Sequence, residues 1–258
     1  MSFLKKCYNE CGDTMQRYFI NETIESNITL HDESVIHHVF HVMRMKIGDE
    51  IVLCDLNKQC YAVKITEMNP NVLKGESLYP IKHQTHPLNI TLGQALIKKD
   101  KFELVIQKAS ELGVNHFLSV SMARSIVKID EKIKHKKVDR FKKIAKEAAE
   151  QTRRNDVMSV GEPTELHNID YDLYDHVLVA YESEQSKSTK KILKTFSKGS
   201  NVLILIGPEG GFNEQEIAYL KSKGALSISL GPRILRSETA AFYILSALSY
   251  ELEMSVES

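Results

Sequence analysis

The stretch NVLILIGPEGGFNEQEIAYL, residues 201–220, joins an apolar run to a helix-like pattern through a Gly-Pro-Glu-Gly-Gly turn. A strand, turn and helix of this kind often hold a phosphate, because free N–H groups at a helix N-terminus attract anions. This turn has the glycine spacing of neither a P-loop nor a dinucleotide-binding motif, and it contains no lysine. Its one charge is the carboxylate of Glu209, which would repel a phosphate. The turn therefore predicts a close backbone approach to a neutral or cationic ligand, and a plain strand-to-helix connection is the alternative.

The helix after this turn begins with its own capping signals. Asn213 is a good N-cap residue, and Glu216 stands three positions later, as in a capping box. Phe212 and Ile217 have the positions of a hydrophobic staple. Because these side chains satisfy the helix start, a phosphate would have to compete with them.

Strand-like apolar runs and helix-like segments alternate from residue 88 to residue 253. This alternation predicts an α/β domain with a mainly parallel sheet, whose ligands lie beyond the carboxyl ends of its strands. Two loops qualify, GPEGG at 207–211 and GPRILRSET at 231–239, because each opens with Gly-Pro directly after an apolar strand. The expected strands are 88–97, 114–120, 175–182, 201–207 and 225–231, and the expected helices include 100–113, 213–224 and 238–253.

The preceding part of the chain has a different pattern. Short alternating runs separated by turn residues predict a small β-rich domain over residues 15–86, and apolar spacing near 3.6 predicts one inserted helix at 33–45. Pro87 and its polar neighbours predict the linker to a second domain, residues 87–258. Residues 1–14 show no period, so we expect a disordered or added extension upstream of a natural start at Met15.

Composition excludes several classes of protein. The 258 residues are 42% hydrophobic and 26% charged, and no apolar run approaches the ~20 residues of a membrane helix. The formal net charge is zero, so any affinity for RNA must come from local patches. Without a zinc-binding spacing or a disulfide framework, the cysteines are expected to be reduced thiols in a cytosol; they are Cys7, Cys11, Cys54 and Cys60.

Two groups of side chains have both a structural and a functional interpretation. Residues 127–156 are rich in Lys and Arg, which fits either the solvated face of an amphipathic helix or an RNA-binding face. Residues His37, His38 and His41 lack a carboxylate partner at metal-ligand spacing, so they fit a helix surface better than a metal site.

Several segments together carry a family resemblance. LILIGPEGG at 203–211 is followed by LGPRILRSETA at 230–240, and the order and spacing extend to most of the chain. In these motifs the chain resembles the RsmE-type ribosomal RNA methyltransferases of the SPOUT superfamily, and only residues 1–14 have no counterpart. The other matching segments are MQRYF at 15–19, HVMRMKIGD at 41–49, LGQALIKKDKFELVIQKASELGV at 92–114 and KKIAKEAAEQTRRN at 142–155.

The resemblance implies a fold, a cofactor and a substrate. The fold is an N-terminal PUA-like β-barrel that binds RNA, followed by a SPOUT-type α/β domain with a C-terminal trefoil knot that holds S-adenosylmethionine. The activity is methylation of N3 of one uridine in the decoding region of 16S rRNA, by a cytoplasmic homodimer without metal. The cofactor-binding residues implied are Gly207, Gly211, Leu230, Gly231, Leu235 and Thr239.

Methylation at N3 requires removal of an imide proton from an unpaired uracil. Arg236 is the expected stabiliser of the uridine anion, because an arginine remains protonated and cannot readily act as the base. Glu209 is the candidate for the base or for the partner that orients Arg236, and its alternative is a brace of the turn. For Arg236 the alternative is an ion pair with Glu238 or Glu209.

The helix of residues 127–156 ends in a second pair of candidate catalytic residues. Gln151 and Arg154 are expected to orient the uracil or a phosphate across the dimer, and a solvated helix end is the alternative. The family usually has glycine where this chain has Arg153. We expect the dimer also because the final helix has an apolar stripe that needs covering, formed by Ala241, Leu245, Leu248 and Leu252.

The residues expected to dock the RNA are basic and would contact phosphates, which position a substrate without specifying its sequence. Three other functions are weighed against the rRNA reading. They are methylation of tRNA or of a ribose 2'-OH by a related knotted enzyme, RNA binding by a non-catalytic ribosome-assembly factor, and nucleotide-dependent oxidoreduction. The expected docking residues are Arg17, Arg44, Arg124, Lys137, Arg140 and Lys143.

Overall fold

The computed structural model describes residues 15–82, 87–127, 131–181 and 189–253, so the predicted extension at 1–14 lies outside the described residues. The chain divides into two compact units. The first comprises Met1–Thr85 together with Ala149–Val157, and the second comprises His86–Ala148 with Met158–Ser258. No pattern in the sequence indicates that residues 149–157 group with the first unit.

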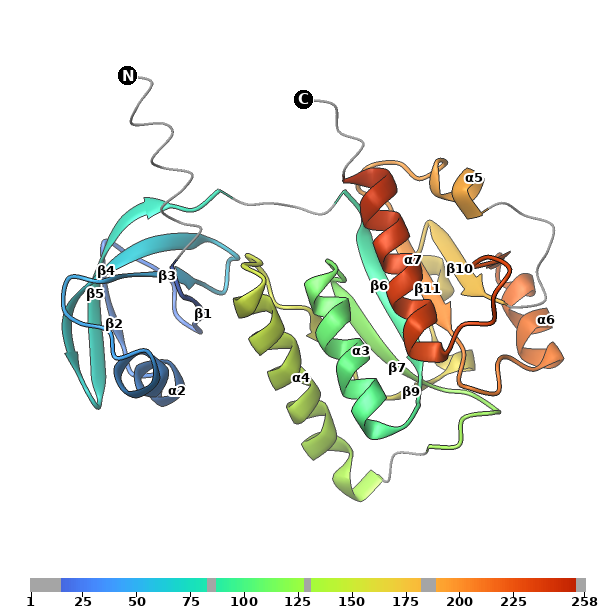
Figure 1. Ribbon diagram of the computed structural model, residues 1–258, viewed down its shortest axis with the longest axis horizontal. Helices are drawn as coiled ribbons and strands as arrows, with labels where there is room; N and C mark the ends of the chain where they lie inside the picture. Colours follow the sequence, from blue (N-terminus) through green and yellow to red (C-terminus); the bar gives the residue numbers. More distant parts are fainter. Residues whose placement is uncertain (1–14, 83–86, 128–130, 182–188, 254–258) are drawn as a thin grey trace. The chain divides into compact units, whose positions relative to one another are not determined.

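The first unit contains a five-stranded sheet in the order β1-β3-β4-β5-β2 (Figure 1). β1 runs parallel to β3, and the other neighbours are antiparallel. Alternating apolar residues of these strands pack into one core with the inserted helix. The strands are β1 (Arg17–Phe19), β2 (Asn27–Leu30), β3 (Glu50–Cys54), β4 (Cys60–Asn69) and β5 (Val72–Pro80).

The predicted inserted helix is confirmed, and it has two parts. The α-helix α2 (Glu33–His37) begins at Asp32, whose side chain accepts hydrogen bonds from the backbone N–H groups of Ser34 and Val35. A π-helical turn, His38–Val42, continues it. Val35, Ile36 and Val39 are buried in the core because they lie on one face of these turns.

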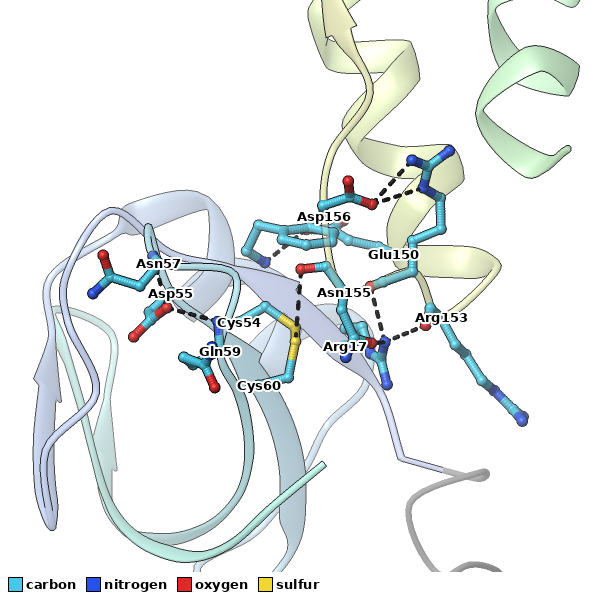
Figure 2. The surroundings of a disulfide bond; sticks show 12 residues. Arg17, Cys54, Asp55, Asn57, Gln59, Cys60, Glu150, Arg153, Asn155 and Asp156 are labelled. Atoms are coloured by element: carbon cyan, nitrogen blue, oxygen red, sulfur yellow. Dashed lines mark hydrogen bonds and ion pairs between the residues drawn. A yellow bond between two sulfur atoms is a disulfide. The ribbon is translucent and has the colours of Figure 1, made fainter. Parts of the chain in front are cut away.

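The prediction of reduced thiols is wrong for Cys54 and Cys60, which form a disulfide (Figure 2). The register of β3 and β4 places these two residues directly opposite each other. They stand at a position whose backbone groups do not bond to each other, where side chains of antiparallel strands approach most closely. In the connecting loop, the Asp55 carboxylate accepts hydrogen bonds from the N–H groups of Asn57 and Gln59 and so holds the two strand ends together.

The second unit contains a seven-stranded sheet in which every pair is parallel, as predicted. Its order is β12-β10-β11-β6-β7-β8, and β9 also pairs with β7. The central strands are buried along nearly their whole length, because helices cover parallel sheets on both faces. The strands are β6 (Asn89–Ala95), β7 (His116–Ser121), β8 (Ser159–Val160), β9 (Thr164–Glu165), β10 (His176–Ala180), β11 (Asn201–Ile206) and β12 (Leu226–Ile228).

The helices of the second unit cover this sheet, and none in the part of the chain described is long and apolar enough to cross a membrane. Figure 1 shows α3 and α7 side by side in front of the sheet, and the two helices are in contact. Most of α4 belongs to this second unit, whereas the last turn of α4, from Ala149, groups with the first unit. The helices are α3 (Lys99–Glu111), α4 (Lys134–Gln151), α5 (Thr189–Leu193), α6 (Glu214–Ser222) and α7 (Ser237–Leu252).

The apolar stripe of α7 is covered within the chain itself. Ala241, Leu245 and Leu248 are buried, and α7 contacts α3 and β11. The expectation that this stripe needs a second subunit to cover it is therefore wrong. The large apolar side chains that α7 exposes are those of Tyr243 and Tyr250, which were not part of the predicted stripe.

Gly75 tests the packing of the first unit. A Cβ atom at this position would lie 2.4 Å from Val63 Cγ1 and 3.1 Å from the carbonyl oxygen of Lys64. Because Val63 is stiff and buried, Gly75→Ala should lower the free energy of unfolding by about 1–3 kcal/mol. Urea denaturation measures this change. The neighbouring exposed variant Glu76→Ala should stay within about 0.5 kcal/mol of the unsubstituted protein, and equal stability of all three proteins would contradict the packing.

Candidate functional site

The two Gly-Pro loops meet at one edge of the parallel sheet and enclose a pocket of about 300 Å³ in the second unit. They come together because β10 lies between β11 and β12, and the carboxyl ends of parallel strands share one edge. The first turn of α7 and the end of β10 complete the wall. The lining residues are Ala180, Tyr181, Ile206–Glu209, Gly211, Phe212, Ser229–Ser237 and Ala240.

The first loop depends on glycine at its start. A Cβ atom on Gly207 would lie 3.1 Å from two ring carbons of Phe212, so the absence of a side chain lets that buried ring close over the loop. The loop then turns through a hydrogen bond that the N–H of Gly211 donates to the carbonyl of Pro208, at 2.9 Å. The pocket wall here is mostly backbone.

Two charged side chains hold the first loop from outside the pocket. Arg124 Nη1 donates to the carbonyl oxygens of Gly210, at 2.9 Å, and Phe212, at 3.3 Å. The buried carboxylate of Glu216 accepts from the N–H groups of Ala123 and Asn213, both at 2.8 Å. Arg124 is a predicted RNA contact, but in the structure it braces the pocket loop.

The predicted capping box at the start of α6 is confirmed. Asn213 Oδ1 accepts from the N–H of Glu216 at 2.7 Å, and the Glu216 side chain accepts from the N–H of Asn213. Glu216 therefore both caps the helix and joins the first loop to the turn after β7. The sequence indicated only the first of these roles.

The second loop is tied to the first by the hydroxyl of Ser237. Its Oγ donates to the carbonyl of Gly207 at 2.6 Å and accepts from Gln94 Nε2 at 2.8 Å. Gln94 lies in β6 and is fully buried. Sequence reasoning missed both residues, although a glutamine inside the apolar run of 88–97 was an available signal.

Gly231 has a φ of +104°, and a Cβ atom there would meet nothing within 4 Å. Its glycine is required by the backbone conformation of the second loop rather than by a close neighbour. Leu230 and Leu235 line the pocket on either side of it. Thr239, also predicted to contact a cofactor, is exposed on α7 and is not one of the lining residues.

Arg236 and Glu209 are exposed, and both line the pocket. The predicted alternative for Arg236, an ion pair with Glu238, is not the contact that Glu238 makes: its carboxylate pairs with Lys101 at 2.9 Å. Burial opposes the charged form of Glu238, but the Lys101 hydrogen bond and nearby positive charges, including that of Arg236, hold its pKa below its usual range. The pairing with Lys101 leaves Arg236 at the pocket.

The basic residues of α4 differ in their contacts. Arg140 forms two hydrogen bonds of 2.6 Å to Glu103, and these bonds lower the pKa of that carboxyl. Lys143 is exposed and lies 3.9 Å from Glu147, whereas Lys137 is half-buried. The predicted docking role of Arg140 would require RNA to share or replace this bidentate ion pair.

The predicted residues of the first unit are either exposed, as Arg44 and Gln151 are, or hydrogen-bonded within the unit, as Arg17 and Arg154 are. Arg44 is exposed among apolar side chains and has a φ of +53°. Arg17 is 6% exposed, and its guanidinium donates to acceptors of the turn after α4, so its burial argues against the predicted RNA contact. Gln151 is exposed, and Arg154 donates to Asp156 Oδ1 from Nε at 3.2 Å and from Nη2 at 3.0 Å.

No group of three or more His, Cys, Asp or Glu side chains in the described ranges is arranged to hold a metal ion. His38 instead shares a hydrogen bond of 2.8 Å with the Tyr18 hydroxyl. His37 and His41 are exposed, and their rings are in tilted contact with centroids 5.1 Å apart.

Comparison with known proteins identifies both units. Residues 84–249 match the RNA methyltransferase domain family, and residues 32–75 match the RNA methyltransferase PUA domain family. The ribosomal RNA small subunit methyltransferase E of Bacillus subtilis is 38% identical, over 93% of this chain and 98% of the relative. The protein of that name from Mesomycoplasma hyopneumoniae is 32% identical, over 90% of this chain and 98% of the relative.

Solved structures are similar over nearly the whole chain. A ribosomal RNA small subunit methyltransferase E from Neisseria gonorrhoeae, bound to S-adenosyl methionine, has a TM-score of 0.80 at 26% identity and covers 92% of this chain and 98% of that structure. A Legionella pneumophila putative methyltransferase in complex with the same cofactor has a TM-score of 0.80 at 28% identity, with the same coverage.

The Ser237 tie can be tested by stability. Ser237→Ala removes the shorter of the two hydrogen bonds of the buried Gln94 amide and the donor to the Gly207 carbonyl, so it should cost about 1–3 kcal/mol of unfolding free energy. Ser119→Ala is the control, because Ser119 is a buried serine of β7 in the same unit and its Oγ has no hydrogen-bond partner in the described part of the chain. Urea denaturation should separate the two variants, and an equal loss in both would count against the tie.

Proposed function

The chain belongs to the RNA methyltransferase family that includes ribosomal RNA small subunit methyltransferase E, and on this premise we propose that it methylates N3 of one uridine in the decoding region of 16S rRNA. The methyl donor is S-adenosylmethionine. The observation that carries the proposal is the pocket between the two Gly-Pro loops, with Arg236 and Glu209 in its wall, in a chain so similar to these enzymes over nearly its full length.

The residues present suit this cofactor. The pocket has the size of a small ligand site, and its wall is mainly backbone and apolar side chains, which suit adenine and ribose. Its acidic lining residue is Glu209, which complements a sulfonium, and the lining includes no lysine for a phosphate. We propose that Gly207, Gly211, Leu230, Gly231 and Leu235 hold the cofactor, and that Thr239 contacts it from α7.

When bound, S-adenosylmethionine supplies an electrophilic methyl group on sulfur. The chain must then hold an unpaired uracil beside it and favour loss of the N3 proton. Arg236 stabilises the negative charge that develops on the base, and Glu209 either accepts the proton or orients Arg236. Gln151 and Arg154 orient the uracil or a neighbouring phosphate from a second copy of the chain.

The proposal extends to fold, assembly and location. We propose that the C-terminal part of the second unit forms a trefoil knot. The return of the chain to the loop after β11 supports this, because Ser237 at the start of α7 bonds to Gly207. We also propose a cytoplasmic homodimer. Its RNA is held by the PUA-like unit through Arg44 and by α4 through Lys137, Arg140 and Lys143. Arg124, which braces the loop after β11, also contacts the RNA.

Mapping the modified nucleotide tests the proposed substrate. The purified protein, S-adenosylmethionine carrying a labelled methyl group, and either 16S rRNA or assembled small subunits should give label on one uridine. Mass spectrometry of nuclease fragments should assign the methyl group to N3. Label on tRNA or on a ribose 2'-OH would overturn the substrate assignment, and cofactor binding without transfer to any RNA would favour an assembly factor.

Arg236→Ala should lower single-turnover methylation by about 100- to 1000-fold, because one preorganised stabiliser of the developing charge is lost. Binding of S-adenosylmethionine and of RNA should change little. Arg233→Ala is the matched control, since it removes the same charge from the same pocket loop and should cost far less. A wild-type rate in Arg236→Ala together with weak RNA binding would place Arg236 among the docking residues.

A further inference from the structure

The turn after α4 has an arginine where helix ends usually have glycine. Arg153 has a φ of +60°, in the left-handed region that a side chain disfavours. The N–H of Arg154 donates to the carbonyl of Ala149 at 3.0 Å, and the N–H of Arg153 donates to the carbonyl of Glu150 at 3.4 Å. These two bonds form a Schellman motif with Arg153 at its left-handed position. Some other interaction must therefore offset the cost of a non-glycine residue there.

Arg17 of β1 supplies that interaction within the same unit (Figure 2). Its Nη1 donates to the carbonyl oxygen of Arg153, to that of Arg154 at 2.8 Å and to Asn155 Oδ1 at 2.6 Å. The three acceptors are consecutive along the turn, so one buried nitrogen holds the conformation of residues 153–155. The positive charge of Arg17 at this end of α4 also interacts favourably with the partial negative charge of the helix C-terminus.

A second contact anchors the last turn of the helix to the same strand. The N–H of Phe19 donates to Glu150 Oε1 at 3.3 Å, two residues along β1 from Arg17. The held segment contains Gln151 and Arg154, and the Arg154 guanidinium is itself oriented by its two bonds to Asp156. Gln151 is the last residue of α4, so the helix sets its direction, and the conformation at residue 153 sets how the chain leaves the helix and where the Arg154 side chain points.

We propose that Arg17 is a positioning residue for the methylation reaction: it holds Arg153 in the left-handed conformation and thereby sets the place of Arg154 relative to Gln151 at the end of α4. This inference rests on the proposed function, because it takes Gln151 and Arg154 as residues that orient the RNA. Arg17 acts through the turn and touches neither cofactor nor base. Its role differs from RNA docking, which would require an accessible guanidinium.

Suppression by glycine is the decisive experiment. Arg17→Met keeps an apolar stem but leaves three acceptors without their donor, so it should lower the single-turnover rate about 10- to 100-fold. The S-adenosylmethionine dissociation constant should stay within about twofold, because the pocket lies in the other unit. Adding Arg153→Gly should restore about tenfold of the lost rate, because glycine adopts the left-handed conformation without cost. Arg17→Lys should rescue partially, since its ammonium offers three donors from one nitrogen.

A matched control separates this effect from general stabilisation. Lys58 has the same φ of +60° in the same unit, and its exposed ammonium lies 3.8 Å from Asp156 Oδ2, so Lys58→Gly alone is measured in parallel to correct for the loss of this ion pair. Compared with Arg17→Met, the double variant Arg17→Met/Lys58→Gly should have a higher melting temperature but the same methylation rate. Equal recovery in this double variant and in Arg17→Met/Arg153→Gly would overturn the proposal.

Hydrogen exchange tests the turn without any dependence on activity. Peptides covering residues 149–157 should exchange faster in Arg17→Met and return toward the wild-type rate when Arg153→Gly is added. Unchanged exchange in Arg17→Met would overturn the proposal. Faster exchange with an unaltered methylation rate would also overturn it, because Arg17 would then anchor the turn without positioning the reaction. If the wild-type protein methylates no rRNA while exchange behaves as expected, the proposed function fails and the anchoring contact remains.

Discussion

The hydroxyl of Ser237 joins three segments that are far apart in the chain. It donates to the carbonyl of Gly207, directly after β11, and accepts from the side-chain amide of Gln94 in β6. Ser237 itself is the first residue of α7. The pocket exists only if the loop after β11 and the loop before α7 stay at this spacing, because their backbones are its walls. Since Arg236 directly precedes Ser237, the same contact sets where that arginine enters the pocket. A buried amide and hydroxyl are costly unless paired, so the tie also resists alternative arrangements of the loops.

A pocket walled by backbone needs support from outside, since glycine loops have few side chains of their own to hold them. Arg124 and Glu216 provide it by bonding to backbone groups on the outer side of the first loop. Because these two charged side chains lie outside the pocket, its wall consists mainly of backbone and apolar side chains. A glycine-rich turn between a strand and a helix therefore forms a pocket wall here without the glycine spacing or the lysine of a phosphate site.

Local signals predicted the elements of both units because each signal acts over a few residues. The alternation of strands and helices, the capping box at Asn213 and the positions of the two Gly-Pro loops follow from neighbours in sequence. Contacts between distant residues could not be paired from such signals. The Gln94–Ser237 bond and the grouping of 149–157 with the first unit depend on tertiary structure, and the cover of the α7 stripe comes from α3 and the sheet. The Cys54–Cys60 disulfide spans only six residues, but it depends on the exact register of β3 and β4, which the sequence pattern did not predict.

Arg153 shows how a local rule, glycine at the left-handed end of a helix, yields to a distant contact. Glycine would let the end of α4 adopt the left-handed turn by itself, with no dependence on another strand. With arginine in that place, the turn depends on Arg17, whose nitrogen bonds to the following carbonyls and to Asn155. The conformation is then a property of the folded first unit rather than of the helix alone. The contacts of Arg17 and Phe19 with residues 150–155 therefore couple the end of α4 to the sheet of the PUA-like unit.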